Sequence, residues 1–179
     1  MVEHAGEILI LTGPPGSGKT TTARALADEA GSPKVHLHSD DFWHFIKHGA
    51  VAPYLPEAHD QNRVVVDVLA KVAQGYAEGG YFVVVDGIVG PWFLPPFAAL
   101  SVPLHYVVLR PSLGVAIERC RERGGDTLTD PGPITALHQQ FSSLSELERH
   151  VLPTGTQSPK DVLREVIAAV DGEAFRLSS

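Results

Sequence analysis

The sequence predicts an α/β protein in which helices cover both faces of a five-stranded parallel sheet. Short apolar runs alternate along the chain with longer segments whose apolar residues recur at helical spacing. This alternation is typical of right-handed βαβ crossovers, which place successive strands parallel in a buried sheet. The chain has 179 residues, of which 44% are hydrophobic, and this is enough for one domain with a real core. We expect a single three-layer α/β/α domain over residues 1–179.

Apolar runs followed by turn-forming or polar residues give the expected strands. Runs of this kind, buried on both faces, are typical of parallel sheets. The strands are expected over residues 8–11 (ILIL), 35–38 (VHLH), 81–85 (YFVVV), 104–109 (LHYVVL) and 151–152 (VL). In such a sheet, ligands bind beyond the carboxyl ends of the strands. We therefore expect the glycine-rich loop after the first strand, Asp40 and Asp41 after the second, and Asp86 after the third to converge.

Helical segments connect these strands. In residues 62–78, one helical face carries Val65, Val68, Leu69, Val72 and Tyr76, and we expect this face to be buried. Ser112 and Ser158 precede two further helices as capping residues. The other helices are expected from residue 19 to Gly31, over 42–47 and over 134–149, and the Gly/Pro-rich stretches 49–56 and 123–133 are expected to be loops.

The loop after the first strand carries the most specific motif in the chain. Residues 13–20, GPPGSGKT, match G-x-x-x-x-G-K-[ST] at every fixed position. Glycines let the backbone wrap a phosphate, and the following helix adds the positive end of its dipole. Lys19 is expected to bridge the outer phosphates and the Thr20 hydroxyl to bind Mg²⁺. We predict that ATP and Mg²⁺ are bound here, by Gly13, Pro14, Pro15, Gly16, Ser17, Gly18, Lys19, Thr20 and Thr21.

Three acidic residues follow the neighbouring strands. Asp86 is expected to support the metal ion, although Asp-Gly is also a common turn pair. Asp40 or Asp41 can accept the proton of an attacking hydroxyl near the γ-phosphate. The alternative is that both residues cap the short helix that starts near Phe42.

These residues resemble those of a known group. With its phosphate loop, "HLHSDDF" and "VVVDG", the chain resembles the small P-loop kinases of the nucleoside-monophosphate-kinase-like group. Within that group it is similar to the branch of chloramphenicol phosphotransferase, gluconate kinase and the zeta-toxin kinases. The resemblance implies a three-layer P-loop NTPase fold with a short lid, Asp40 as the catalytic base with Asp41 as the alternative, and a metal role for Asp86. An antitoxin partner, as for a toxin kinase, is not indicated by the sequence.

Arginines precede the expected lid, residues 123–133. Arg119 and Arg123 lie four residues apart and so share a helix face. A guanidinium fork stabilises the charge of phosphoryl transfer, and the resemblance implies this role for lid arginines. The alternative is a solvated basic face that pairs with neighbouring glutamates. Arg121 is not assigned to the site.

The acceptor-binding segment is expected over residues 42–63. Its expected walls are aromatic, with Arg63 and the stretch from Gly90 to Phe93 completing them, although helix packing also explains such aromatics. The aromatic residues of the segment are Phe42, Trp43, Phe45 and Tyr54. An arginine-rich pocket for a nucleoside monophosphate is not found.

Composition narrows the class of protein. A formal net charge of −7 disfavours nucleic-acid and membrane surfaces, and a single cysteine, Cys120, excludes an internal disulfide and fits a reducing compartment. The N-terminus does not resemble a signal peptide and no apolar run spans a bilayer, so we expect a cytoplasmic protein. His36, His38, His44 and His48 are interpreted as ordinary core or surface residues rather than a zinc site.

The sequence thus favours ATP- and Mg²⁺-dependent phosphoryl transfer to a hydroxyl of a small molecule. The alternatives are a nucleoside or nucleotide kinase, and a regulatory NTPase that changes shape without an acceptor. The sequence carries no indication of oligomeric state.

Overall fold

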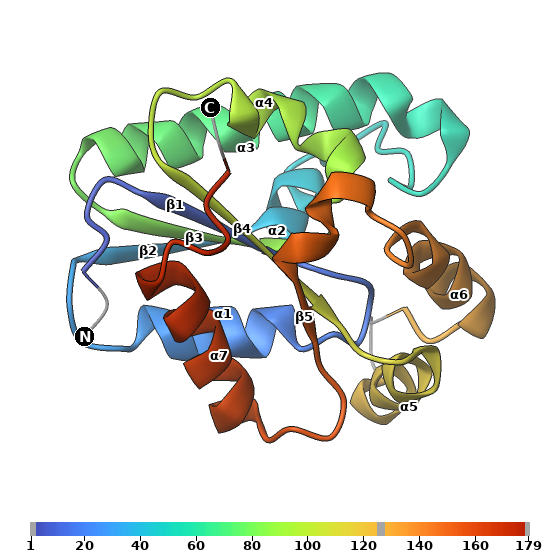
Figure 1. The fold of residues 1–179 in the computed structure, drawn as a ribbon. Helices are drawn as coiled ribbons and strands as arrows, with labels where there is room; N and C mark the ends of the chain where they lie inside the picture. Colours follow the sequence, from blue (N-terminus) through green and yellow to red (C-terminus); the bar gives the residue numbers. More distant parts are fainter. Residues whose placement is uncertain (1–2, 125–127, 178–179) are drawn as a thin grey trace.

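The apolar runs form the expected parallel sheet of five strands. The computed structural model describes residues 3–124 and 128–177. The strands are β1 (Ile8–Thr12), β2 (Lys34–His38), β3 (Phe82–Gly87), β4 (Leu104–Arg110) and β5 (Val151–Pro153). Their order across the sheet is β2-β3-β1-β4-β5. Helix α3 (His59–Glu78) covers one face of the sheet, and α1 (Lys19–Ala27) and α7 (Pro159–Asp171) cover the other (Figure 1). The three-layer α/β/α fold is confirmed.

Alternate side chains of the central strands enter two separate cores. Ile8 and Ile10 of β1 pack on the α3 side, whereas Leu9 and Leu11 pack on the side of α1 and α7. All four side chains are fully buried. A strand that is buried on both faces needs apolar residues at every position, which is why ILIL reads as a continuous run.

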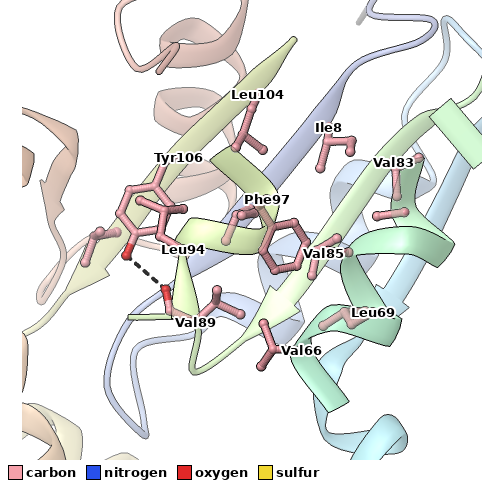
Figure 2. Packing of buried hydrophobic residues seen from close by; sticks show 14 of the residues in the cluster. Ile8, Val66, Leu69, Val83, Val85, Val89, Leu94, Phe97, Leu104 and Tyr106 are labelled. Atoms are coloured by element: carbon pink, nitrogen blue, oxygen red, sulfur yellow. Dashed lines mark hydrogen bonds between the residues drawn. The ribbon is translucent and has the colours of Figure 1, made fainter. Parts of the chain in front are cut away.

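The core under α3 also fixes the chain that follows β3. Phe97 of the short helix α4 (Pro95–Ala98) is fully buried beside β1 and β3 (Figure 2). The Tyr106 hydroxyl donates a hydrogen bond to the Val89 carbonyl at 2.9 Å. Burial raises the pKa of Tyr106, so the hydroxyl keeps its proton and remains a donor. This bond anchors the turn that leads to η2 (Pro91–Phe93), one wall of the site described below.

The buried face of α3 differs from the expected one. Val65 and Leu69 are buried as predicted, but Val68 and Tyr76 are 45% and 43% exposed. Alanines take their place in the core, because small side chains let the helix lie close to the sheet. The buried face of α3 consists of Asn62, Val65, Val66, Leu69, Ala70, Ala73 and Ala77.

The predicted helix over 134–149 is confirmed only over its first half. Helix α6 (Pro131–Gln140) ends at Gln140, and a separate 3-10 helix, η3 (Ser145–His150), follows it. The Glu148 carboxylate accepts a hydrogen bond from the Leu144 backbone N–H at 3.0 Å and pairs with Arg110 of β4 at 2.9 Å. These contacts favour the break, and the contact with β4 is distant in sequence and invisible to a periodicity analysis.

Two expected caps are confirmed, while several boundaries move. The Ser112 and Ser158 hydroxyls accept backbone N–H bonds at the starts of α5 (Leu113–Arg123) and α7. Helix α1 ends at Ala27, before Gly31. Helix α2 (Ser39–His44) begins at Ser39, so Asp40 and Asp41 lie in its first turn rather than before it.

The loop expected over 123–133 is shorter than predicted, because helices extend into both of its ends. Arg123 belongs to α5, and residues 131–133 belong to α6. Residues 125–127 of the expected lid lie outside the described residues. No helix within the described ranges is both long and apolar enough to cross a bilayer.

Truncating the α3 side of the core should destabilise the protein strongly. Leu69 is fully buried, so Leu69→Ala should lower the free energy of unfolding by about 2–5 kcal/mol. Val64, on the same helix, is 58% exposed, and Val64→Ala should change it by no more than about 0.5 kcal/mol. Urea denaturation of both variants measures the difference. Equal effects would contradict the assigned face of α3.

Candidate active site

Three neighbouring strands end beside one cleft. The phosphate loop follows β1, α2 follows β2, and Asp86 lies near the end of β3. In the sheet Asp86 is level with Leu11 of β1 and with His38 of β2. The cleft beyond these ends has a volume of about 1210 Å³. Of the residues predicted for the site, it is lined by Pro15, Gly16, Lys19, Thr20, Thr21, Asp40 and Arg123.

The phosphate loop has a backbone that only glycine tolerates at two packed positions. Gly13 and Gly16 have φ values of 146° and 75°. A Cβ on Gly13 would collide with the Leu109 carbonyl, and one on Gly16 with the Ala116 carbonyl. The loop is thus pressed against β4 and α5 and led into the N-terminus of α1, where backbone N–H groups have no partner within the helix.

Two side chains of the loop are suited to an anionic ligand. The Ser17 hydroxyl is buried and has no hydrogen-bond partner among the described residues. Within residues 3–124 and 128–177, the one hydrogen bond of the Lys19 ammonium is a 3.4 Å contact with the Pro14 carbonyl. Burial lowers the pKa of Lys19, while the nearby charges of Asp40 and Asp86 oppose that shift. An unpaired donor and an incompletely neutralised cation at a helix N-terminus fit the phosphates of a nucleotide.

Asp86 is fully buried and receives three hydrogen bonds. Thr20 donates its hydroxyl proton to Oδ2 at 2.5 Å, while His36 Nε2 and His38 Nδ1 contact Oδ1 at 2.5 and 3.1 Å. Burial alone would raise the pKa of Asp86, but these hydrogen bonds outweigh it and hold the pKa far below its ordinary value. The carboxylate is therefore ionised at neutral pH. Its oxygens and the Thr20 hydroxyl are the hard donors that Mg²⁺ prefers, so the pair fits the predicted metal site.

Sequence reasoning missed the role of the two histidines on β2. His36 and His38 were interpreted as ordinary residues, but both contact Asp86. The signal was their i, i+2 spacing, which puts both rings on the same face of a strand that ends beside Asp86. The hydrogen bond to Asp86 raises the pKa of His38, although burial opposes this, so His38 is protonated more readily than a free histidine.

The two aspartates of α2 are placed differently. Asp40 lines the cleft together with Lys19 and Thr20, whereas Asp41 does not. Asp40 Oδ2 lies 3.7 Å from Nε2 of His38, whose other ring nitrogen contacts Asp86. The end of β3 and the start of α2 are in close contact, because a Cβ on Gly87 would overlap the Ser39 side chain. The charge of Asp40 also acts on Lys19, so Asp40 lies on the phosphate-loop side of the cleft.

The two predicted arginines also differ in position. Arg123 lines the cleft. The Arg119 guanidinium donates to the Gly155 carbonyl at 2.9 Å and approaches the Gly16 carbonyl at 3.5 Å. Arg119 thus braces the phosphate loop against the chain that follows β5, and no sequence pattern pointed to Gly155 as its partner.

The expected acceptor segment is fastened to the start of α3. The Asn62 side chain donates to the Pro53 carbonyl and accepts from the Trp43 indole N–H, both at 2.8 Å. Gln61 makes two hydrogen bonds with the backbone of Val51, at 2.7 and 2.8 Å. Both amides were missed in the sequence, and they hold the irregular loop over 49–56 in one place.

Only part of the expected acceptor wall lines the cleft. Trp43, Tyr54 and the η2 residues Trp92 and Phe93 do so. Phe42 packs instead against the core under α3, and Phe45 is 67% exposed. The Arg63 side chain is also 67% exposed and pairs with Asp60 at 3.6 Å, away from the cleft.

The histidine–aspartate contact can be tested by titration. Asp86→Asn removes the negative charge and weakens the hydrogen bond that together raise the pKa of His38, whereas the burial that lowers it remains. The His38 pKa measured by NMR should therefore lie above 6.5 in the natural protein and fall in the variant. An unchanged His38 titration in Asp86→Asn would contradict the assigned network.

Solved structures of kinases share this fold. A sugar kinase from Janibacter sp. is 18% identical with a TM-score of 0.68, covering 92% of this chain and 94% of its own. A gluconokinase from Sinorhizobium meliloti is 19% identical with a TM-score of 0.67, covering 96% and 95%. A thymidylate kinase from Candida albicans is 15% identical with a TM-score of 0.69, covering 99% and 97%. At these identities the likeness shows the fold.

A curated relative is similar over a part of its length. The chain is 27% identical over 169 residues to the Holliday junction branch migration complex subunit RuvB of Nocardioides sp.. The match covers 86% of this chain and 44% of that protein, so the chain spans less than half the length of this relative.

Residues 9–130 match a family described as an AAA domain, AAA_18. The matched region begins at β1, contains the phosphate loop and extends to the residue before α6. The match covers well over half of the chain, and the predicted resemblance to small P-loop kinases is confirmed at the level of the fold. The chain belongs to this AAA domain family and has the fold of a small P-loop kinase.

Proposed function

We propose that the protein transfers the γ-phosphoryl group of ATP to a hydroxyl of an uncharged small molecule. The observation that carries this proposal is a single cleft with two unlike halves. One half contains Lys19 and the phosphate loop, and the other is lined by aromatic side chains of α2, the following loop and η2. Asp40 lies on the lining of the same cleft.

The phosphate loop is proposed to hold the polyphosphate of ATP. Backbone N–H groups of residues 13–21 bind the phosphate oxygens, and the unpaired Ser17 hydroxyl donates a further hydrogen bond. Lys19 follows the γ-phosphate because its ammonium has, among the described residues, no hydrogen-bond partner closer than the Pro14 carbonyl at 3.4 Å. Phosphoryl transfer depends on positioning and on charge stabilisation, and these groups supply both.

Thr20 and Asp86 are proposed to hold Mg²⁺. When bound, the ion neutralises charge on the phosphate oxygens. The contribution of this chain is a carboxylate that stays ionised because His36, His38 and Thr20 hydrogen-bond to it. The histidines also fix the orientation of the carboxylate, as outer partners do in metal sites.

Asp40 is proposed as the general base. It takes the proton from the acceptor hydroxyl while the acceptor oxygen bonds to the γ-phosphorus, and the bond from that phosphorus to the bridging oxygen of ADP breaks. The position of Asp40 on the cleft supports it over Asp41. Arg123 is proposed to stabilise the transferred group, with Arg119 acting beside the loop through its contact with Gly16.

The acceptor half of the cleft favours an uncharged molecule. Among the described lining residues from segments 43–62 and 88–93, none is lysine or arginine. The lining residues there that can carry a positive charge are His44 and His59, so a phosphate or carboxylate on the acceptor would be desolvated without a permanently charged partner, which is unfavourable. Aromatic rings instead favour a flat or sugar-like face. This charge pattern supports a hydroxyl acceptor over a nucleoside monophosphate.

A second candidate is an ATPase without an acceptor. It is favoured by the family match to an AAA domain and by the partial similarity to a RuvB subunit. This candidate requires ATP hydrolysis that small hydroxyl compounds do not accelerate.

The two candidates differ in a rate assay. ADP release from Mg·ATP is measured with a panel of sugars, nucleosides, nucleotides and hydroxylated antibiotics. An uncharged acceptor should raise the rate far above the background, and Lys19→Ala should abolish it. Asp40→Ala should lower turnover about 100-fold or more by loss of the base while leaving ATP binding nearly intact.

Asp41→Ala is the matched control, because Asp41 occupies the same helix turn but not the cleft. It should retain most of the activity. Normal turnover by Asp40→Ala would contradict the proposed base. ATP hydrolysis that no acceptor stimulates would favour the ATPase.

A further inference from the structure

We propose that His4, Glu7 and His105 form a binding site for a divalent transition metal, of the zinc type, which fastens both ends of the described chain to the sheet. The site lies at the amino ends of β1 and β4, and the phosphate loop lies beyond their carboxyl ends. It is independent of the proposed phosphotransferase function. The three residues are the one group of potential ligands of this kind in residues 3–124 and 128–177.

The ligand atoms already converge. Glu7 Oε2 lies 2.6 Å from His4 Nδ1 and 2.9 Å from His105 Nε2, and the three atoms lie within 4.8 Å of one another. Two imidazole nitrogens and one carboxylate oxygen are a donor set that zinc binds readily, with a fourth position left for water. An ion at about 2.0–2.2 Å from each donor separates the donors by more than 2.6–2.9 Å, so Glu7 Oε2 has to move away from both nitrogens to admit it.

The sheet fixes two of these ligands. His105 lies on β4 directly beside Leu9 of β1, and its side chain is fully buried. Glu7 precedes β1, and the next residue, Ile8, donates its backbone N–H to the Pro103 carbonyl at 2.9 Å. The His4 ring packs against the rings of His105 and Phe82, with centroids 5.5 and 5.4 Å apart. His105 is thus held on a packed strand, and Glu7 lies directly before one.

An outer carboxylate orients His4. Its Nε2 contacts Asp171 Oδ1, at the end of α7, at 2.9 Å. Metal-bound histidines characteristically donate their second ring N–H to a carboxylate. Both nitrogens of His4 face carboxylates, so both contacts are hydrogen bonds only when the ring carries two protons. A metal ion on Nδ1 would replace one proton and keep the N–H bond to Asp171.

The position of the site gives the metal a structural role. His4 belongs to the segment before β1, and Asp171 ends α7. After α7 the chain returns to β4, where Tyr106 N–H donates to the Phe175 carbonyl at 2.9 Å and Leu177 N–H to the Leu104 carbonyl at 2.8 Å. A metal ion bound here links the segment before β1 and the segment at the end of α7 to the middle of the sheet. Because the ion binds only to the folded state, it raises the free energy of unfolding.

The test is a titration of the full chain with Co²⁺, whose absorption bands report imidazole ligands, followed by competition with Zn²⁺. One equivalent of Co²⁺ should bind per chain, and Zn²⁺ should displace the Co²⁺. The midpoint of thermal unfolding should rise when metal is added and fall when a chelator removes the metal. Glu7→Gln and His105→Gln should each weaken binding at least 10-fold, and Asp171→Asn should weaken it about 10-fold through the outer contact.

The matched control is the double variant His36→Gln/His38→Gln, which removes the two imidazoles that contact Asp86. It should still bind one equivalent with the same bands. If His105→Gln fails to fold, the proposal is tested by metal binding to Glu7→Gln and by the effect of chelator on the thermal midpoint of the natural protein. The proposal is overturned if neither metal binds at micromolar concentration, or if binding is lost in the double variant and retained in Glu7→Gln and His105→Gln.

Discussion

The buried carboxylate of Asp86 is the constraint on which the arrangement of the candidate site depends. An ionised carboxylate in the core costs several kcal/mol unless it is fully hydrogen-bonded. Asp86 meets this need with donors from two other elements, Thr20 of α1 and the histidines of β2. The network therefore fixes α1, β2 and β3 relative to one another. Asp40 follows His38 by two residues, so the same network also sets the position of the proposed base.

Positive charge is gathered in one part of the resulting cleft, although the net charge of the whole chain is negative. The protein carries a formal net charge of −7, yet the part of the cleft near the phosphate loop has Lys19, Arg24 and Arg123 among its lining residues. The opposite part is aromatic and is fastened by Asn62 and Gln61 at the start of α3. An anionic donor and an uncharged acceptor fit these two halves.

Local patterns predicted most of the fold, and nonlocal contacts account for what they missed. The phosphate loop, the strands and the caps at Ser112 and Ser158 depend on neighbouring residues, so the sequence alone revealed them. The partners of Asp86, Arg119 and Asn62 come from other elements, and only the folded chain shows them. The prediction for the buried face of α3 was partly wrong because it favoured large apolar residues over the alanines that allow close packing. Asp40 and Arg123 line the cleft, and their chemical roles stay predictions.

The central claim is that the γ-phosphoryl group passes to an acceptor hydroxyl and not to water. Phosphorus NMR of the protein with Mg·ATP and an uncharged hydroxyl acceptor tests it most directly, because the product itself is observed. The account predicts a new phosphate monoester resonance that grows in step with ADP. Growth of ADP together with inorganic phosphate, and no monoester for any acceptor that binds the cleft, would contradict it.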